Sequence, residues 1–73
     1  MDIKQKFGLV VKVLRNKKGV SQESLALDTG IDRTYIGDIE RGSRNVSLEI
    51  MEKLAVYFQM SISELLKIVE ETK

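Results

Sequence analysis

Two short helices separated by a glycine are encoded between Ser21 and Arg44, in the segment SQESLALDTGIDRTYIGDIERGSR. Ser21 can cap a first helix, because its hydroxyl can accept a hydrogen bond from a free N–H group of the first turn. Gly30 can end that helix in the left-handed conformation, and Asp32 can cap a second helix almost at once. The turn between them is therefore very tight. The two helices must cross steeply and leave one face of the second helix uncovered.

This arrangement is typical of a helix-turn-helix, in which the second helix enters the major groove of double-stranded DNA. At 100° per residue, Ile36 and Ile39 point toward a core, and the opposite arc of the helix is polar. Tyr35 and Glu40 fall at the margins. This helical-wheel projection predicts five residues that read bases, namely Arg33, Thr34, Tyr35, Gly37 and Asp38.

Each of these side chains has a chemical reason to face DNA. Arg33 can donate two hydrogen bonds to guanine, and the Thr34 methyl can contact a thymine methyl. Tyr35 can reach a phosphate or a base edge. Gly37 either permits close approach to DNA or is a tolerated cost of about 1 kcal/mol relative to alanine. Asp38 can accept from a cytosine amine, but we favour a local tether to Arg41 or Thr34.

Phosphate contacts are expected on both sides of the second helix, since they supply most of the affinity that does not depend on sequence. Gln22 lies in the first turn of the preceding helix, where free N–H groups and the helix dipole favour an anion. Beyond the second helix, which Gly42 can stop, the predicted phosphate contacts are Arg41, Ser43, Arg44 and Asn45. The alternative is that RGSRN is only a polar connector.

The composition of the 73 residues excludes several classes of function. The chain has no cysteine and no histidine, which removes disulfides, thiolate nucleophiles, tetrahedral zinc sites and imidazole bases. We expect no enzymatic activity, cofactor, metal or small-molecule substrate, because the acidic residues form no plausible pocket. No apolar run approaches the roughly 18 residues of a membrane span, and the start lacks the apolar core of a signal peptide. A cytoplasmic protein without a membrane partner is expected.

Charge is distributed unevenly along the chain, although its formal sum is only +1. Residues 1–44 hold nine Lys or Arg against six Asp or Glu, a balance of +3, whereas residues 45–73 hold three against five, a balance of −2. The basic part contains the motif, which supports a polyanionic partner. Ordinary scatter of surface charge explains this asymmetry equally well.

Recurring cap residues and the absence of proline divide the chain into about five helices, which predicts an all-α fold. The first helix should run from about residue 3 to Lys17 and end near Gly19. Its apolar side should comprise Ile3, Phe7, Val10, Val11 and Leu14. The later four helices should be capped by Ser21, Asp32, Ser47 and Ser61, with Glu64 completing a capping box at the last. No linker interrupts the pattern, so residues 1–73 are predicted to form a single DNA-binding domain.

The motifs SQESLA, GIDRTYIGDIERG and SLEIMEKLA resemble the core of the phage Cro and lambda-repressor-like regulators, the xenobiotic-response-element type of helix-turn-helix. DRTYI followed by IERGSRN is most similar to the controller proteins of bacterial restriction-modification systems. The resemblance implies a five-helix homodimer that binds a two-fold symmetric operator, often in its own promoter. It also implies a buried ion pair between Arg15 and Glu40. Val46 and Gln59 depart from the pattern, since similar sequences often carry proline and glycine there.

The last two predicted helices carry more apolar residues than one core needs, which predicts self-association. The dimer interface is predicted to include Ile50, Tyr57, Phe58, Leu65 and Ile68. The alternative is that these residues are exposed singly, which is common at protein surfaces.

The residues therefore predict a transcriptional regulator that recognises an operator sequence, as a repressor or an activator. A contact between an acidic surface of the protein and RNA polymerase is a further open alternative. A function in protein binding, and not in DNA binding, is the alternative. The acidic C-terminal half suits a protein-interaction module, such as an antitoxin-like domain that binds a partner protein.

Overall fold

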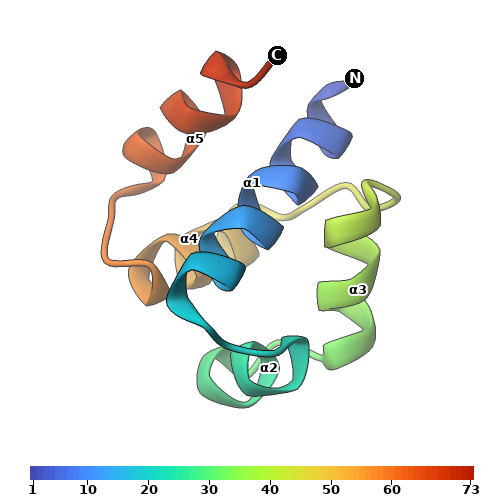
Figure 1. Cartoon of the computed structure of the whole chain (residues 1–73), viewed down its shortest axis with the longest axis vertical. Helices are drawn as coiled ribbons and strands as arrows, with labels where there is room; N and C mark the ends of the chain where they lie inside the picture. Colours follow the sequence, from blue (N-terminus) through green and yellow to red (C-terminus); the bar gives the residue numbers. More distant parts are fainter.

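The computed structural model describes all 73 residues and contains five helices and no strand, so the predicted all-α, five-helix fold is confirmed (Figure 1). Helix α1 lies in the middle of the molecule, with α3 along one side and α5 along the other (Figure 1). None of the helices is long and apolar enough to cross a bilayer. The helices are α1 (Ile3–Lys18), α2 (Gln22–Thr29), α3 (Arg33–Arg41), α4 (Leu48–Tyr57) and α5 (Ile62–Glu71).

The helix boundaries are fixed by side-chain caps, and all four predicted caps are confirmed. Ser21, for example, accepts from the Ser24 N–H at 3.0 Å. At Ser61 the predicted capping box is complete, because Glu64 accepts from the Ser61 N–H at 2.8 Å. That hydrogen bond lowers the pKa of Glu64 below its ordinary value. Helix α1 has a second capping box, between Asp2 and Gln5, that was not predicted.

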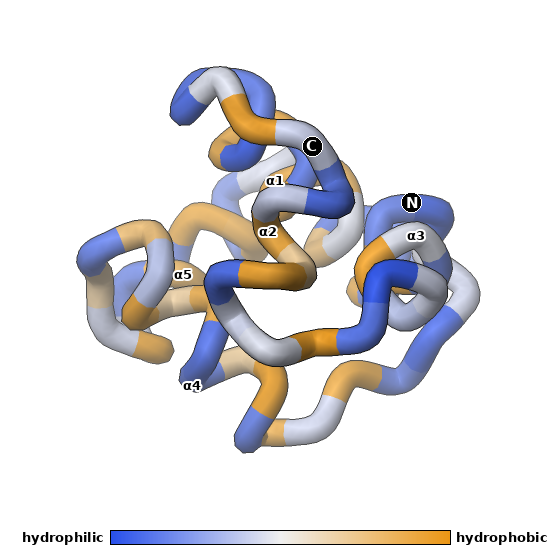
Figure 2. Tube along the Cα trace, turned by 90° about the horizontal axis from the view of Figure 1, so that it is seen from below, coloured by the Kyte–Doolittle hydropathy of each residue, from blue (hydrophilic) through white to orange (hydrophobic).

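Each helix carries both hydrophobic and hydrophilic residues along its length (Figure 2). The hydrophobic core forms where the apolar sides of the five helices meet. Phe7, Val10 and Val11 of α1 are buried, as predicted. Ile3 was assigned to the same side, but its side chain is 60% exposed because α1 begins beyond the edge of the core. The residues that are most completely buried are Val11, Leu25, Ile36, Ile39, Leu54, Leu65 and Val69.

Gly8 allows α1 and α3 to approach closely, and the sequence pattern gave no sign of this role. A β-carbon at this position would overlap the carbonyl oxygen of Ile39 and crowd the backbone of Glu40. Any other residue would therefore force the two helices apart. The separation of α1 from α3 is set by the absence of a side chain at Gly8.

The turn between α2 and α3 has the predicted geometry. Gly30 adopts φ 75°, in the left-handed region, and its N–H donates to the Ala26 carbonyl. Ile31 follows directly and is buried, and Asp32 then caps α3. This one-residue spacing holds α3 across α2.

Gln59 ends α4 in a left-handed conformation, with φ 60°, and is the only residue other than glycine with a positive φ. A side chain in this region costs roughly 1–2 kcal/mol, because the β-carbon crowds the following carbonyl. Gln59 therefore strains the turn into α5.

Replacing Gln59 with glycine should raise the free energy of unfolding by about 0.5–1 kcal/mol, the relief of strain less the entropy lost by glycine. Urea unfolding followed by circular dichroism measures the change. Gly30→Ala is the matched control, because it places a side chain at φ 75° with open space around it and should destabilise. Loss of stability in Gln59→Gly would contradict this account of the turn.

Candidate nucleic-acid interface

Helix α3 buries one side and presents the other to solvent, as the wheel predicted. Ile36 and Ile39 are buried against α1 and α2. Arg33 and Thr34 are exposed in the first turn, while Tyr35 is half-buried at the margin. The exposed side runs along the flank of the molecule, where no other helix covers it (Figure 1).

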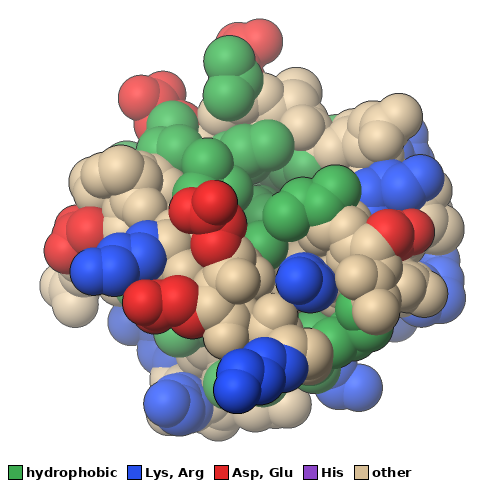
Figure 3. All heavy atoms as spheres, turned by 90° about the horizontal axis from the view of Figure 1, so that it is seen from above, with side chains coloured by type: hydrophobic (Ala, Val, Ile, Leu, Met, Phe, Trp, Pro, Cys, Tyr) green, Lys and Arg blue, Asp and Glu red, His purple; other side chains and the backbone are tan.

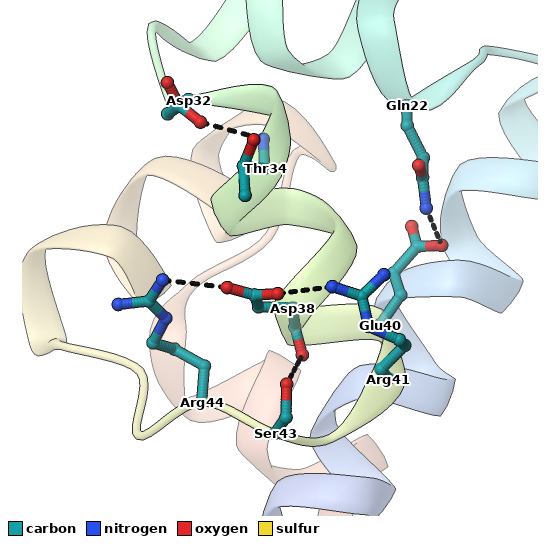
Figure 4. Close-up of polar contacts among 8 residues, drawn as sticks. All are labelled: Gln22, Asp32, Thr34, Asp38, Glu40, Arg41, Ser43 and Arg44. Atoms are coloured by element: carbon teal, nitrogen blue, oxygen red, sulfur yellow. Dashed lines mark hydrogen bonds and ion pairs between the residues drawn. The ribbon is translucent and has the colours of Figure 1, made fainter.

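Asp38 lies at the centre of a polar cluster on this exposed side (Figure 4). Its carboxylate accepts from Arg41 and, at 2.8 Å, from Arg44 Nη2. Its carbonyl oxygen accepts from the Ser43 hydroxyl at 3.2 Å. The predicted tether to Arg41 is confirmed, and Arg44 joins it. Thr34 makes no hydrogen bond to Asp38, and its backbone N–H donates to the cap residue Asp32.

The two arginines lower the pKa of Asp38 below its ordinary value, with the hydrogen bond from Arg44 the largest cause. Because the folded pKa is lowered, these interactions stabilise the fold above the ordinary range of a carboxyl group. They are lost as the pH falls through the folded value. Asp38 is therefore ionised at neutral pH and keeps both arginines beside it.

Two side chains of the cluster cover other predicted base-reading residues. The Arg44 guanidinium stacks on the Tyr35 ring, with its carbon 4.3 Å from the ring centroid. The Arg41 guanidinium lies over Gly37, where a β-carbon would be 3.2 Å from Nη1. Gly37 is buried, and the side chain that lies over it is the Arg41 guanidinium. The helical wheel placed its backbone correctly but could not show the arginine folded across it.

The ion pair between Arg15 and Glu40, which the family resemblance implied, is present beneath the interface. Arg15 Nε and Nη2 donate to the two oxygens of Glu40 at 2.7 and 3.0 Å. Their side chains are only 12% and 4% exposed. Arg15 also donates to the Val20 carbonyl at 2.8 Å. The hydrogen bond to Glu40 raises the pKa of Arg15, so the guanidinium stays charged. The pair braces α1 against α3.

Gln22 completes this network, and the sequence gave no sign of it. Its Nε2 donates to Glu40 Oε1 at 3.0 Å, so the first turn of α2 is tied to α3 (Figure 4). The partners are 18 positions apart, a separation that no local pattern reveals. A side-chain amide has two N–H donors, so one remains for a phosphate.

The residues predicted for a dimer interface differ in how far they are exposed. Leu65 is 0% exposed and belongs to the core, so its assignment to the interface is wrong. Tyr57 and Phe58 meet edge to face at 5.3 Å, and the Tyr57 hydroxyl donates to Asp28 at 3.2 Å. Burial, followed by that hydrogen bond, raises the pKa of Tyr57. Ile50 is half-buried, and only Ile68 is exposed.

No three acidic side chains lie together in a way that could hold a metal ion.

Comparisons with known proteins agree with this geometry. A helix-turn-helix family model matches residues 11–65. Control protein C.MunI from a Mycoplasma species is 45% identical over 71 residues, covering 96% of this chain and 96% of that protein. Control protein C.BamHI from Bacillus amyloliquefaciens is 49% identical over 55 residues, covering 74% and 68%. The crystal structure of the restriction-modification controller protein C.AhdI from Aeromonas hydrophila superposes with a TM-score of 0.79 at 48% identity, covering 85% of this chain and 94% of that one.

The chain belongs to the helix-turn-helix family of DNA-binding transcriptional regulators, a class of regulators and not of enzymes. Within that family it belongs with the controller proteins of restriction-modification systems, as the motifs DRTYI and IERGSRN predicted.

Removing Glu40 should show how strongly α3 depends on its ion pair. Glu40→Ala leaves the Arg15 guanidinium largely buried without a partner, which should cost about 3 kcal/mol of unfolding free energy. Urea unfolding of Glu40→Ala, Arg15→Met and the double variant Arg15→Met/Glu40→Ala measures the coupling. The double variant should be more stable than the sum of the single losses predicts. Simple additivity would contradict direct coupling between these two side chains.

Proposed function

We propose that residues 1–73 act as a single DNA-binding domain that binds a palindromic operator as a homodimer. The regulated genes would belong to a restriction-modification system and include the gene for this chain. The observation that carries the proposal is the exposed side of α3, which begins with Arg33 and Thr34. Arg33 makes no ion pair, unlike the other three arginines of the chain. Its guanidinium is therefore available to a base.

Base reading is assigned to the first turns of α3, whose residues lead into the major groove in this class of motif. Arg33 would donate two hydrogen bonds to guanine, and the Thr34 methyl would contact a thymine methyl. Tyr35 and Asp38 lie further along the same side and would meet the next base edges.

Phosphate binding is assigned to the two flanks of α3. On one flank, Gln22 offers its second amide N–H at the start of α2. On the other, Arg41, Ser43 and Arg44 occupy the end of α3 and the loop that follows (Figure 4), and Asn45 lies next in the same loop. These contacts would fix the position of α3 on the duplex, because phosphates carry no sequence information directly.

The two-fold interface is proposed to be centred on α5, at the end of the molecule where α1 also begins. Ile68 lines a groove with Leu9 and Val13, and on another side of α5 Leu66 lines a second groove with Ile3. Figure 3 looks onto this end and shows apolar side chains gathered at its centre, with charged side chains around them. Ile50, Tyr57 and Phe58 remain predicted members of the interface. A contact with RNA polymerase also remains a prediction.

Selection from a randomised duplex pool at physiological salt tests the function. We expect enrichment of a palindrome whose half-sites lie about 34 Å apart, one turn of DNA. Arg33→Ala should lose roughly 1–3 kcal/mol of discrimination at one guanine in each half-site. Arg44→Ala is the comparison variant, because losing a phosphate contact should weaken binding to the selected duplex and lower its salt slope by about one unit without changing the preferred base. No enrichment by the folded protein, or equal losses on selected and random DNA for Arg33→Ala, would contradict the proposal.

Sedimentation equilibrium at micromolar concentrations tests the interface. Ile68→Glu should convert the dimer to a monomer, because a carboxylate would be trapped between two apolar surfaces. Leu27→Glu is the matched control, since Leu27 is exposed on α2 and lines a groove that contains no residue of α5. A wild-type monomer, or an Ile68→Glu dimer as stable as the control, would rule out the interface.

A further inference from the structure

Asp38 is an acid on a surface that the proposed function directs at a polyanion. Its carboxylate is partly exposed on the same side of α3 as Arg33 and Thr34. The other acid of the helix, Glu40, is buried with Arg15 and does not face solvent. A carboxylate beside the groove repels phosphate, so Asp38 weakens attraction to DNA in general unless it has a compensating role.

The cations expected to grip phosphate are already paired with this carboxylate. Arg41 and Arg44 approach Asp38 from opposite sides and donate to different oxygens (Figure 4). The Ser43 N–H and hydroxyl both donate to the Asp38 carbonyl, at 3.1 and 3.2 Å. One residue therefore fixes three of the four side chains predicted to grip the backbone beyond α3.

Both guanidinium groups are held in folded-back positions by a second contact. Arg44 stacks on the Tyr35 ring at 4.3 Å, and Arg41 lies over the bare backbone of Gly37. Each arginine thus covers part of the surface that would read bases. Each arginine donates to Asp38 through Nη2 alone, so its other N–H groups stay open, but the carboxylate offsets its charge toward a phosphate. An arginine that extends to a phosphate with its full charge leaves Asp38, and its departure uncovers Tyr35 or Gly37.

This coupling suits discrimination between DNA sequences. Random DNA offers phosphates to the arginines but no set of base edges suited to Asp38. A matched site offers an exocyclic amine of cytosine or adenine in the major groove, which can donate to the carboxylate in place of the arginines. Partly exposed ion pairs are individually weak, so such an exchange is reversible.

We propose that Asp38 determines specificity by withholding Arg41 and Arg44 from phosphates until a base amine replaces them on its carboxylate. The proposal rests on the DNA-binding function proposed above. It assigns Asp38 two linked roles, as the partner of the arginines in the free protein and as a base reader on the operator.

Asp38→Asn tests this directly, because it keeps the shape of the side chain and removes its charge. The matched control is Glu52→Gln, which removes one exposed, unpaired negative charge on α4. Dissociation constants are measured over a salt series for a randomised duplex pool and for the duplex selected by the wild type. Asp38→Asn should bind the random pool roughly tenfold more tightly than the control, with a salt slope steeper by about one to two units. Its preference for the selected duplex should fall by a similar factor.

Two further variants test whether Asp38 withholds the arginines from phosphate or only supports the structure of the loop. In an Arg41→Ala/Arg44→Ala background, Asp38→Asn should increase affinity for random DNA much less than in the wild type, because only the direct repulsion of phosphate by the carboxylate is then relieved and no withheld cation remains. Asp38→Glu keeps the charge and should restore most of the preference for the selected duplex. Loss of affinity for both duplexes in Asp38→Asn would overturn the proposal, since Asp38 would then be positioning the arginines for contact.

Elution from a heparin column keeps this test independent of the proposed operator. Heparin is a generic polyanion, and Asp38→Asn should elute at higher salt than Glu52→Gln. Equal elution would overturn the withholding role even if an operator is found. If the wild type selects no DNA sequence, the proposed function fails by that result alone, and base exchange at Asp38 fails with it.

Discussion

The position of α3 depends on how α1 packs against its inner side. Gly8 lets the α1 backbone lie against the carbonyls of Ile39 and Glu40, which sets the separation of the two helices. The ion pair between Arg15 and Glu40 then fixes their relative rotation, because both guanidinium edges are used, on Glu40 and on Val20. Gln22 connects α2 to the same carboxylate. Glu40 therefore holds α1, α2 and α3 in the relative orientation that leaves Arg33 exposed.

The small net charge of +1 is compatible with DNA binding once the acids are located. Glu40 is neutralised by Arg15 inside the fold, and Asp38 is neutralised by Arg41 and Arg44 at the surface. Neither acid is a free negative charge toward DNA. The potential that a duplex meets depends on these local pairings more than on the sum over the chain. A regulator with moderate excess charge gains selectivity, because its attraction to random DNA is limited.

Local features of the fold were predictable from the sequence, whereas features that depend on tertiary contacts were not. The caps Ser21, Asp32, Ser47 and Ser61 act within three residues, so their pattern is visible in the chain itself. The exposed side of α3 is predicted equally well from the helical spacing of its apolar residues. The burial of Gly37 depends on the rotamer of Arg41, and the burial of Leu65 depends on how α5 docks on α1 and α4. Neither can be obtained from a helical wheel, which gives the direction in which a side chain points but not the residues that pack against it.

Helix α5 connects the stability of the domain to its proposed assembly. Leu65 and Val69 fill the core from one side of α5, while Ile68 remains exposed on another. A partner that covers Ile68 would hold the same helix that closes the core, and association would stabilise the folded subunit by mass action. A domain of this size buries only about 60% of the surface exposed in its unfolded chain, so such a contribution is substantial relative to its stability. Occupancy of a two-fold operator would then rise steeply with protein concentration, because folding, pairing of subunits and pairing of half-sites all favour the dimer.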